Sequence, residues 1–130
     1  MPRLDTWDAV KAAAKRHVTP NGDPVDYFEA GYLFGAQLHG DPVQHLECAY
    51  FVESIDSYVF ANNVPHKARL YRVCRISDQG KVDRYPFDVP ERLMDITRQE
   101  DAFILRDEVV KNLRKVHALE IAVGEAGFEA

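Results

Sequence analysis

Residues 67–76, Lys-Ala-Arg-Leu-Tyr-Arg-Val-Cys-Arg-Ile, decide the fold class of this chain. The apolar side chains recur at every second position, interrupted by Arg72, and this is the period of a strand with one buried face: Ala68, Leu70, Cys74 and Ile76. Ser-Asp-Gln-Gly at residues 77–80 is a turn, and residues 81–87 are expected to return as the partner strand, with Pro86 near its end. The sequence therefore predicts a hairpin over residues 67–88.

Helical patterns precede this hairpin. Residues 6–18 place apolar side chains on one face at helical spacing, and Asp5 is the expected N-cap. Thr19-Pro20-Asn21-Gly22 ends this helix. Asp23-Pro24 then has the composition of a second helix start, but several glycines leave the end of that helix open.

Residues 41–62 allow two interpretations. Asp41-Pro42 again has the composition of a helix start, so one interpretation is a continuous helix through about residue 62. The other is a short helical turn, a strand at Cys48–Val52 and a new helix capped by Ser54. We favour the second, because residues 50–52 are strand-favouring and serine is a good cap.

The C-terminal third predicts helices and a last strand. Thr97-Arg98-Gln99-Glu100 forms a capping box for a short helix, and residues 107–116 are helical by their apolar spacing. Leu119, Ile121 and Val123 alternate as a final strand, and residues 124–130 are expected to be loose. The predicted fold is one α+β domain over residues 1–130, with N-terminal helices packed on a small, mostly antiparallel sheet.

Composition limits the function classes. The chain has 130 residues, 46% hydrophobic and 28% charged, with a net charge of −5, as in one soluble globular domain. The negative charge disfavours general nucleic-acid or anionic-membrane binding and suits a basic protein partner. The sequence has no signal-peptide core and no apolar run of about 20 residues, so a cytoplasmic location without membrane contact is expected.

Isolated reactive side chains give weak patterns. His39 and His45 lie six residues apart without a third ligand, so no metal site is expected. Cys48 and Cys74 sit in apolar surroundings typical of reduced core thiols, although the sequence leaves open a disulfide between them. The basic residues of the central strand are expected to pair with acidic side chains on a solvated face: Lys67, Arg69, Arg72 and Arg75.

One stretch resembles a known family. It combines Cys-Ala-Tyr-Phe-Val-Glu-Ser-Ile-Asp-Ser at residues 48–57, an expected aromatic helix with Ala61, Ala-Arg-Leu-Tyr-Arg-Val at residues 68–73, and a turn ending at Gly80. With Phe-Glu-Ala-Gly at residues 28–31, this pattern resembles the middle of small ADP-ribosyltransferases of the rifamycin-modifying kind. The resemblance covers about residues 27–88.

The resemblance implies NAD as the cofactor. His39, in Leu38-His39-Gly40, would orient NAD, Tyr50 would stack on the nicotinamide, and Asp83 would act at the acceptor side, where positive charge develops. His39 and Tyr50 are only 11 residues apart, whereas the family has a long segment between them, so a minimal or degenerate enzyme is implied. The alternative is a non-catalytic acidic binding module (an inhibitor, immunity or adaptor protein) that contacts a basic partner.

Overall fold

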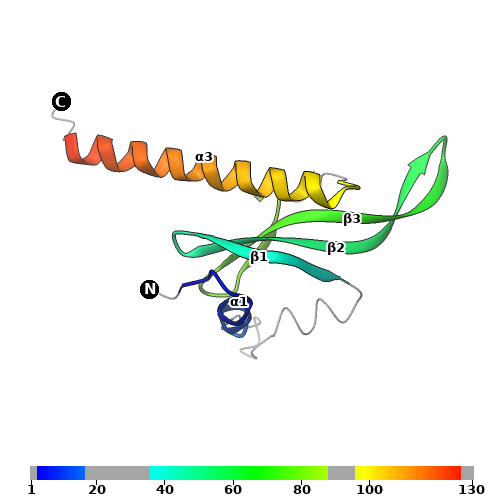
Figure 1. Ribbon diagram of the computed structural model, residues 1–130, viewed down its shortest axis with the longest axis horizontal. Helices are drawn as coiled ribbons and strands as arrows, with labels where there is room; N and C mark the ends of the chain where they lie inside the picture. The colour runs from blue at the N-terminus through cyan, green and yellow to red at the C-terminus, as the bar shows by residue number, and fades with distance from the viewer. Residues whose placement is uncertain (1–2, 17–35, 88–95, 127–130) are drawn as a thin grey trace.

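The computed structural model describes residues 3–16, 36–87 and 96–126. Its elements, in chain order, are α1 (Trp7–Ala14), β1 (Gln37–His45), β2 (Cys48–Ala61), β3 (Val64–Ser77), β4 (Val82–Arg84) and α3 (Gln99–Ala126). The strands form one antiparallel sheet in the order β1-β2-β3-β4. Figure 1 shows α1 on one side of the sheet and α3 running across the other. The predicted α+β class is confirmed, and the second predicted helix lies outside the described residues.

The hairpin of β2 and β3 is the longest unit of the sheet. It pairs 14 residues of each strand, from Cys48↔Ser77 to Ala61↔Val64. Asn62 and Asn63 both have positive φ, 51° and 62°, as a two-residue type I′ turn requires. The predicted strand at residues 67–76 and its return partner are confirmed, although the strand is longer and β4 is short.

Beyond its pairing with β1 and β4, the hairpin continues as a two-stranded projection (Figure 1). We call residues 55–70 the β-arm. The expected helix after Ser54 is wrong, because this segment of β2 pairs with β3 along its whole length. Ser54 is fully buried and its hydroxyl is hydrogen-bonded to His39, so it caps no helix.

The predicted helix start at Asp41-Pro42 is also wrong. The pairing of β1 with β2 shifts register between His39 and Val43, so Asp41 and Pro42 lie in a β-bulge. Proline has no backbone N–H to offer to the sheet, and a bulge in an edge strand accommodates this loss. The same dipeptide suits a helix start for the same reason, so composition alone does not separate the two structures.

Two side chains from opposite layers bond to this bulge. The indole Nε1 of Trp7 in α1 donates to the carbonyl oxygen of Gly40 at 2.7 Å. From α3, Nη1 of Arg106 donates to the carbonyl oxygen of Asp41 at 2.9 Å. The bulge therefore joins both helices to β1.

The apolar core lies between α1 and the sheet. It combines residues from the N-terminal segment with alternate residues of β2 and β3: Leu4, Val10, Ala13, Ala14, Ala49, Phe51, Cys74 and Ile76. The observed N-cap of α1 is Thr6 rather than Asp5, because the Thr6 hydroxyl accepts from the Ala9 N–H at 3.2 Å. The helix ends at Ala14, and residues 17 and 18 of the prediction lie outside the described residues.

The C-terminal third is one helix of 28 residues. Its first half packs on the sheet through Ala102, Arg106 and Val110, which are buried. Arg114 and His117 still contact the end of β1, and the C-terminal part beyond them extends past the sheet (Figure 1). The predicted strand from Leu119 to Val123 is therefore wrong, as is the loose tail for residues 124–126, while residues 127–130 lie outside the described residues. The intervening residues are good helix formers, and a helix already formed on the sheet propagates through them: Ala118, Glu120 and Ala122.

Replacing Gly40 tests the contact between the bulge and α3. Gly40 has φ +69°, and a Cβ there would lie 2.7 Å from Cε1 of Phe103. Gly40→Ala should therefore reduce the free energy of unfolding by about 2–4 kcal/mol, from backbone strain and overpacking. Urea denaturation at one fixed protein concentration measures this difference.

Gly124→Ala is the matched control. Gly124 lies in α3, and a Cβ added there would have nothing within 4 Å, so alanine should raise stability by about 0.5–1 kcal/mol. Equal stabilities for the two variants would contradict the close approach of Phe103 to β1.

Candidate functional site

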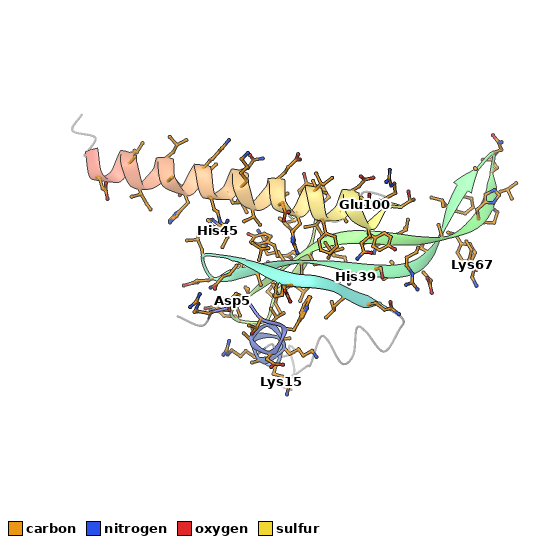
Figure 2. All side chains as sticks on the ribbon, in the orientation of Figure 1. Asp5, Lys15, His39, His45, Lys67 and Glu100 are labelled. Carbon is orange, nitrogen blue, oxygen red and sulfur yellow. The ribbon has the colours of Figure 1, made fainter. Side chains whose placement is uncertain are left out.

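The three residues expected to serve NAD share the face of the sheet that α3 covers. Tyr50 pairs with Arg75, Arg75 pairs with Asp83, and paired residues of antiparallel strands project to the same side. His39 pairs with Val52, which is two residues from Tyr50 and therefore on the same side. Figure 2 labels His39 on β1. A common face alone does not make a site.

Arg75 joins Tyr50 and Asp83. Its Nη2 donates to Oδ2 of Asp83 at 2.9 Å, and it also hydrogen-bonds the Tyr50 side chain. The guanidinium lies 4.5 Å from the centroid of the Phe87 ring. Burial raises the pKa of Tyr50, which is 4% exposed, so the phenol is neutral at neutral pH. Two predicted residues thus meet, through a cation that the sequence prediction did not assign to the site.

His39 has a separate set of contacts. Its Nε2 lies 2.6 Å from Oγ of Ser54, and its ring centroid lies 5.6 Å from that of Tyr71. Burial, followed by the charge of Arg69, lowers the pKa of His39 and favours the neutral imidazole. A neutral histidine bonded to a serine hydroxyl is the geometry of a base and its nucleophile. Because Ser54 is fully buried, a substrate has no access to its Oγ here, and the pair holds β1 to β2.

Neither cysteine is an activated nucleophile. Cys48 and Cys74 are free thiols, half-buried and buried respectively. Burial raises the pKa of Cys48, and it raises that of Cys74 well above the ordinary value, with a further increase from the nearby Glu53. Glu53 is itself buried and forms an ion pair with Arg84. Both thiols are therefore protonated at neutral pH, and reactivity requires the thiolate.

Two of the basic residues of β3 pair with acids, as predicted. Arg75 binds Asp83, and Nη2 of Arg69 lies 3.1 Å from Oδ1 of Asp56. Both pairs are within one sheet face, so these guanidinium groups are engaged in cross-strand contacts. This reduces the charge that β3 offers to a phosphate backbone.

Two cavities among the described residues are not lined by any of the predicted NAD residues. A groove of about 420 Å³ separates β1 from α3, and its walls carry one acidic and three basic side chains besides apolar ones: Val43, Asp107, Val110, Lys111, Arg114, Lys115 and Ala118. A second hollow of about 260 Å³ lies at the base of the β-arm, beside Asp56, Lys67 and Arg69.

The larger groove is locally cationic. At its end, the ring centroids of His45 and His117 lie 5.8 Å apart, and burial and the charges of His117 and Arg114 lower the pKa of His45. Arg114 also donates from Nη2 to the carbonyl oxygen of Gln44 at 3.1 Å. The groove can therefore attract anions.

Exposed apolar side chains gather on two projections. Seven of the nine large hydrophobic residues that are exposed in the described chain lie on the β-arm or on the second half of α3: Tyr58, Phe60, Val64, Val116, Leu119, Ile121 and Val123. The sequence prediction missed both surfaces, because it assigned the first to a helix and the second to a strand. Concentrated apolar exposure is typical of an interaction surface.

Within the described residues, no group of three or more histidine, cysteine or acidic side chains is arranged to hold a metal ion. Among the same residues, no helix has the length and apolar character needed to cross a membrane.

Comparison with protein-family models, with curated proteins and with solved structures finds no match to this chain. The resemblance to ADP-ribosyltransferases therefore stays a prediction, and the functional argument depends on the geometry of the chain itself.

The lowered pKa of His39 predicts a pH-dependent stability. The unfolded chain takes up this proton near the ordinary pKa of about 6.5, whereas the folded protein takes it up at lower pH. The contribution to stability is therefore complete above the ordinary pKa and decreases as pH falls toward the folded-state pKa. Urea denaturation at pH 7.5 and 5.0 should show a larger loss for the wild type than for His39→Gln.

His45, whose pKa is also lowered, is present in both proteins and does not affect this difference. Identical pH dependence in the wild type and His39→Gln would contradict the burial of a neutral His39.

Proposed function

We propose that this protein is a non-catalytic protein-binding module that contacts a basic partner through its β-arm. The observation that carries the proposal is the exposure of large apolar side chains on a two-stranded projection. Tyr58, Phe60 and Val64 are 58%, 74% and 52% exposed, respectively. Burying such side chains against a partner removes apolar surface from water, and aromatic residues are enriched at the centres of protein interfaces.

The β-arm offers these side chains in a fixed geometry. Tyr58 and Phe60 are two residues apart in β2 and therefore lie on one face, beside Lys67 and Pro65 of β3. Figure 2 labels Lys67 on this projection. Among the described residues, the arm strands pair only with each other, so their outer edges carry backbone groups available to a further strand. A partner segment can thus add along an edge and cover the aromatic face.

Charge supports a basic partner. The whole chain carries a net charge of −5, which attracts a positively charged protein and accelerates its encounter. The basic residues at the base of the arm do not oppose this strongly, because Arg69 is paired with Asp56. We therefore assign apolar contact to the arm and long-range attraction to the rest of the surface.

The double variant Tyr58→Ser, Phe60→Ser tests this function. The full chain should retain a stoichiometric basic protein from a lysate of the cells that express it, and the affinity for that purified protein is then measured by titration calorimetry. Loss of one central aromatic contact costs about 2 kcal/mol, which is roughly thirtyfold in affinity. The wild-type affinity should also fall as salt is raised from 0.1 to 0.5 M.

Ile121→Ser is the matched control, because Ile121 is an exposed apolar residue in the C-terminal part of α3, which projects on the other side of the molecule from the β-arm (Figure 1). It should leave the affinity unchanged. Equal binding by the wild type and the β-arm variant, or binding that is insensitive to salt, would sink this proposal.

NAD-dependent ADP-ribosyl transfer is a second candidate function. One observation favours it: Tyr50 and Asp83, expected to serve nicotinamide and acceptor, contact the same guanidinium of Arg75. Tyr50 is almost fully covered, so nicotinamide stacking requires the cover over this ring to move. We therefore rank this function below protein binding.

NAD titration tests the second candidate. If NAD binds, a concentration of ten times its dissociation constant should stabilise the fold by about 1.4 kcal/mol and raise the melting temperature by a few degrees. Tyr50→Leu should lose this shift relative to its own ligand-free melting temperature. An unchanged wild-type melting temperature at millimolar NAD would eliminate the enzyme hypothesis.

A further inference from the structure

The second half of α3 carries a seven-residue apolar repeat. If Val109 is assigned to heptad position a, positions a also include Val116 and Val123, and positions d are Leu105, Asn112 and Leu119. Valine at a with leucine at d is the pattern of a parallel two-stranded coiled coil. Leu119, Ile121 and Val123 also alternate with period two. A short window around them therefore indicates a strand rather than the seven-residue repeat.

The repeat is exposed from Asn112 onward. Upstream, position a contacts the sheet through Ala102, which is fully buried, whereas Arg106 and Val110 are buried at positions e and b. Val116, Leu119 and Val123 are 51%, 65% and 45% exposed, and Asn112 is exposed as well. We call these four residues the α3 seam. It begins where α3 still contacts the end of β1, through Arg114 and His117, and continues onto the part of α3 that extends past the sheet (Figure 1). From Asn112 to Val123 the seam is about 17 Å long, at 1.5 Å per residue.

We propose that the α3 seam binds the α3 seam of a second copy of this chain as a parallel coiled coil. This surface is separate from the β-arm, so the inference does not rest on the proposed function. It concerns self-association, whereas the β-arm is assigned to a different partner.

Charge complementarity identifies the occupant as a second copy in parallel orientation. Lys115 occupies position g, and Glu120 occupies position e of the next heptad. In a parallel pair, residue g of one helix lies beside the following e residue of the other, so two Lys115–Glu120 contacts form across the interface. Each copy thus supplies both the cation and the anion.

Asn112 supports the same orientation. In a parallel pair, the two Asn112 amides lie in one layer and can hydrogen-bond to each other. An antiparallel pair centred on Val116 and Leu119 would place Asn112 against Val123 and would separate Lys115 from Glu120. Burying an amide against an apolar side chain without a hydrogen bond is unfavourable, so the parallel register is preferred.

The packing of α3 on the sheet explains how so short a seam can support dimerisation. Two heptads are too few for a stable helix in isolation, because the helix itself must first form. Here the first half of α3 is fixed by Arg106, which bonds to Asp41, and by buried Ala102 and Val110. Helix ordering is thus complete in the monomer, and association buries only the seam. The short contact predicts a dissociation constant on the order of 1–100 µM.

Sedimentation equilibrium of the full chain between 1 and 500 µM tests the proposal. The wild type should change from monomer to dimer over this range. Leu119→Lys, at the centre of the seam, should remain monomeric at every concentration, with an unchanged melting temperature at the lowest one. Ile121→Lys is the matched control and should dimerise like the wild type, because Ile121 is exposed on the same half of α3 but lies outside the seam.

Charge exchange tests the parallel orientation. Lys115→Glu and Glu120→Lys should each weaken dimerisation at least fivefold, and the double variant should restore it. These residues are five apart, so they are not neighbours on their own helix and the rescue must come from contact between chains. A wild type that is monomeric at 500 µM, a Leu119→Lys variant that dimerises, or a double variant without rescue would each overturn the proposal.

Discussion

The antiparallel pairing of β2 with β3 is the constraint on which the rest of this structure depends. The same register of 14 residue pairs builds two different regions. In the first, the hairpin lies between α1 and α3, with Phe51 and Cys74 directed to α1 and Tyr50 and Arg75 to the opposite face. In the second, no layer of the described chain covers the ribbon and it becomes the β-arm. A shift by one residue would exchange the two faces, so both helices fix this register.

The bulge in β1 fixes the position of α3. Gly40 allows Phe103 to approach, and the carbonyl of Asp41 accepts from Arg106, so the first half of α3 is held over β1. Because α3 is longer than the sheet beneath it, its C-terminal part projects on one side of the molecule while the β-arm projects on the other (Figure 1). The polar residues of the covered face, including His39 and Ser54, are used in contacts within the sheet. The β-arm and the C-terminal part of α3 expose apolar surface and do not form an open catalytic cleft.

The sequence predicted the parts of this fold that depend on local alternation. The strand at residues 67–76 and its turn at Gly80 were correct, because the period and the turn residues agree there. Asp41-Pro42 was assigned wrongly, because proline has no backbone N–H and neither a β-bulge nor the first turn of a helix requires one. Leu119 to Val123 was also assigned wrongly, because α3 is already nucleated by its packing against the sheet, which lies outside any local window.

The candidate site was accessible to sequence reasoning only in part. Tyr50 and Asp83 were named as candidates from the sequence, but their common face and the cation between them, Arg75, depend on the register of three strands. Phe60 and Leu119 are exposed because no other part of the described chain packs over them. Their neighbours in the sequence do not indicate this exposure. The heptad spacing of α3 is visible in the sequence. Whether its apolar side chains are exposed to a partner depends on where the sheet ends.

Disulfide cross-linking at position 112 tests the pairing of two α3 helices most directly. The full chain would carry Asn112→Cys together with Cys48→Ser, while the buried thiol of Cys74 is retained. Mild oxidation should produce a covalent dimer, because a parallel coiled coil places the two residues at position 112 in one layer, and Ile121→Cys in the same background should not. Absence of the 112–112 link, or a link between Asn112→Cys of one chain and Val123→Cys of another, would contradict this account.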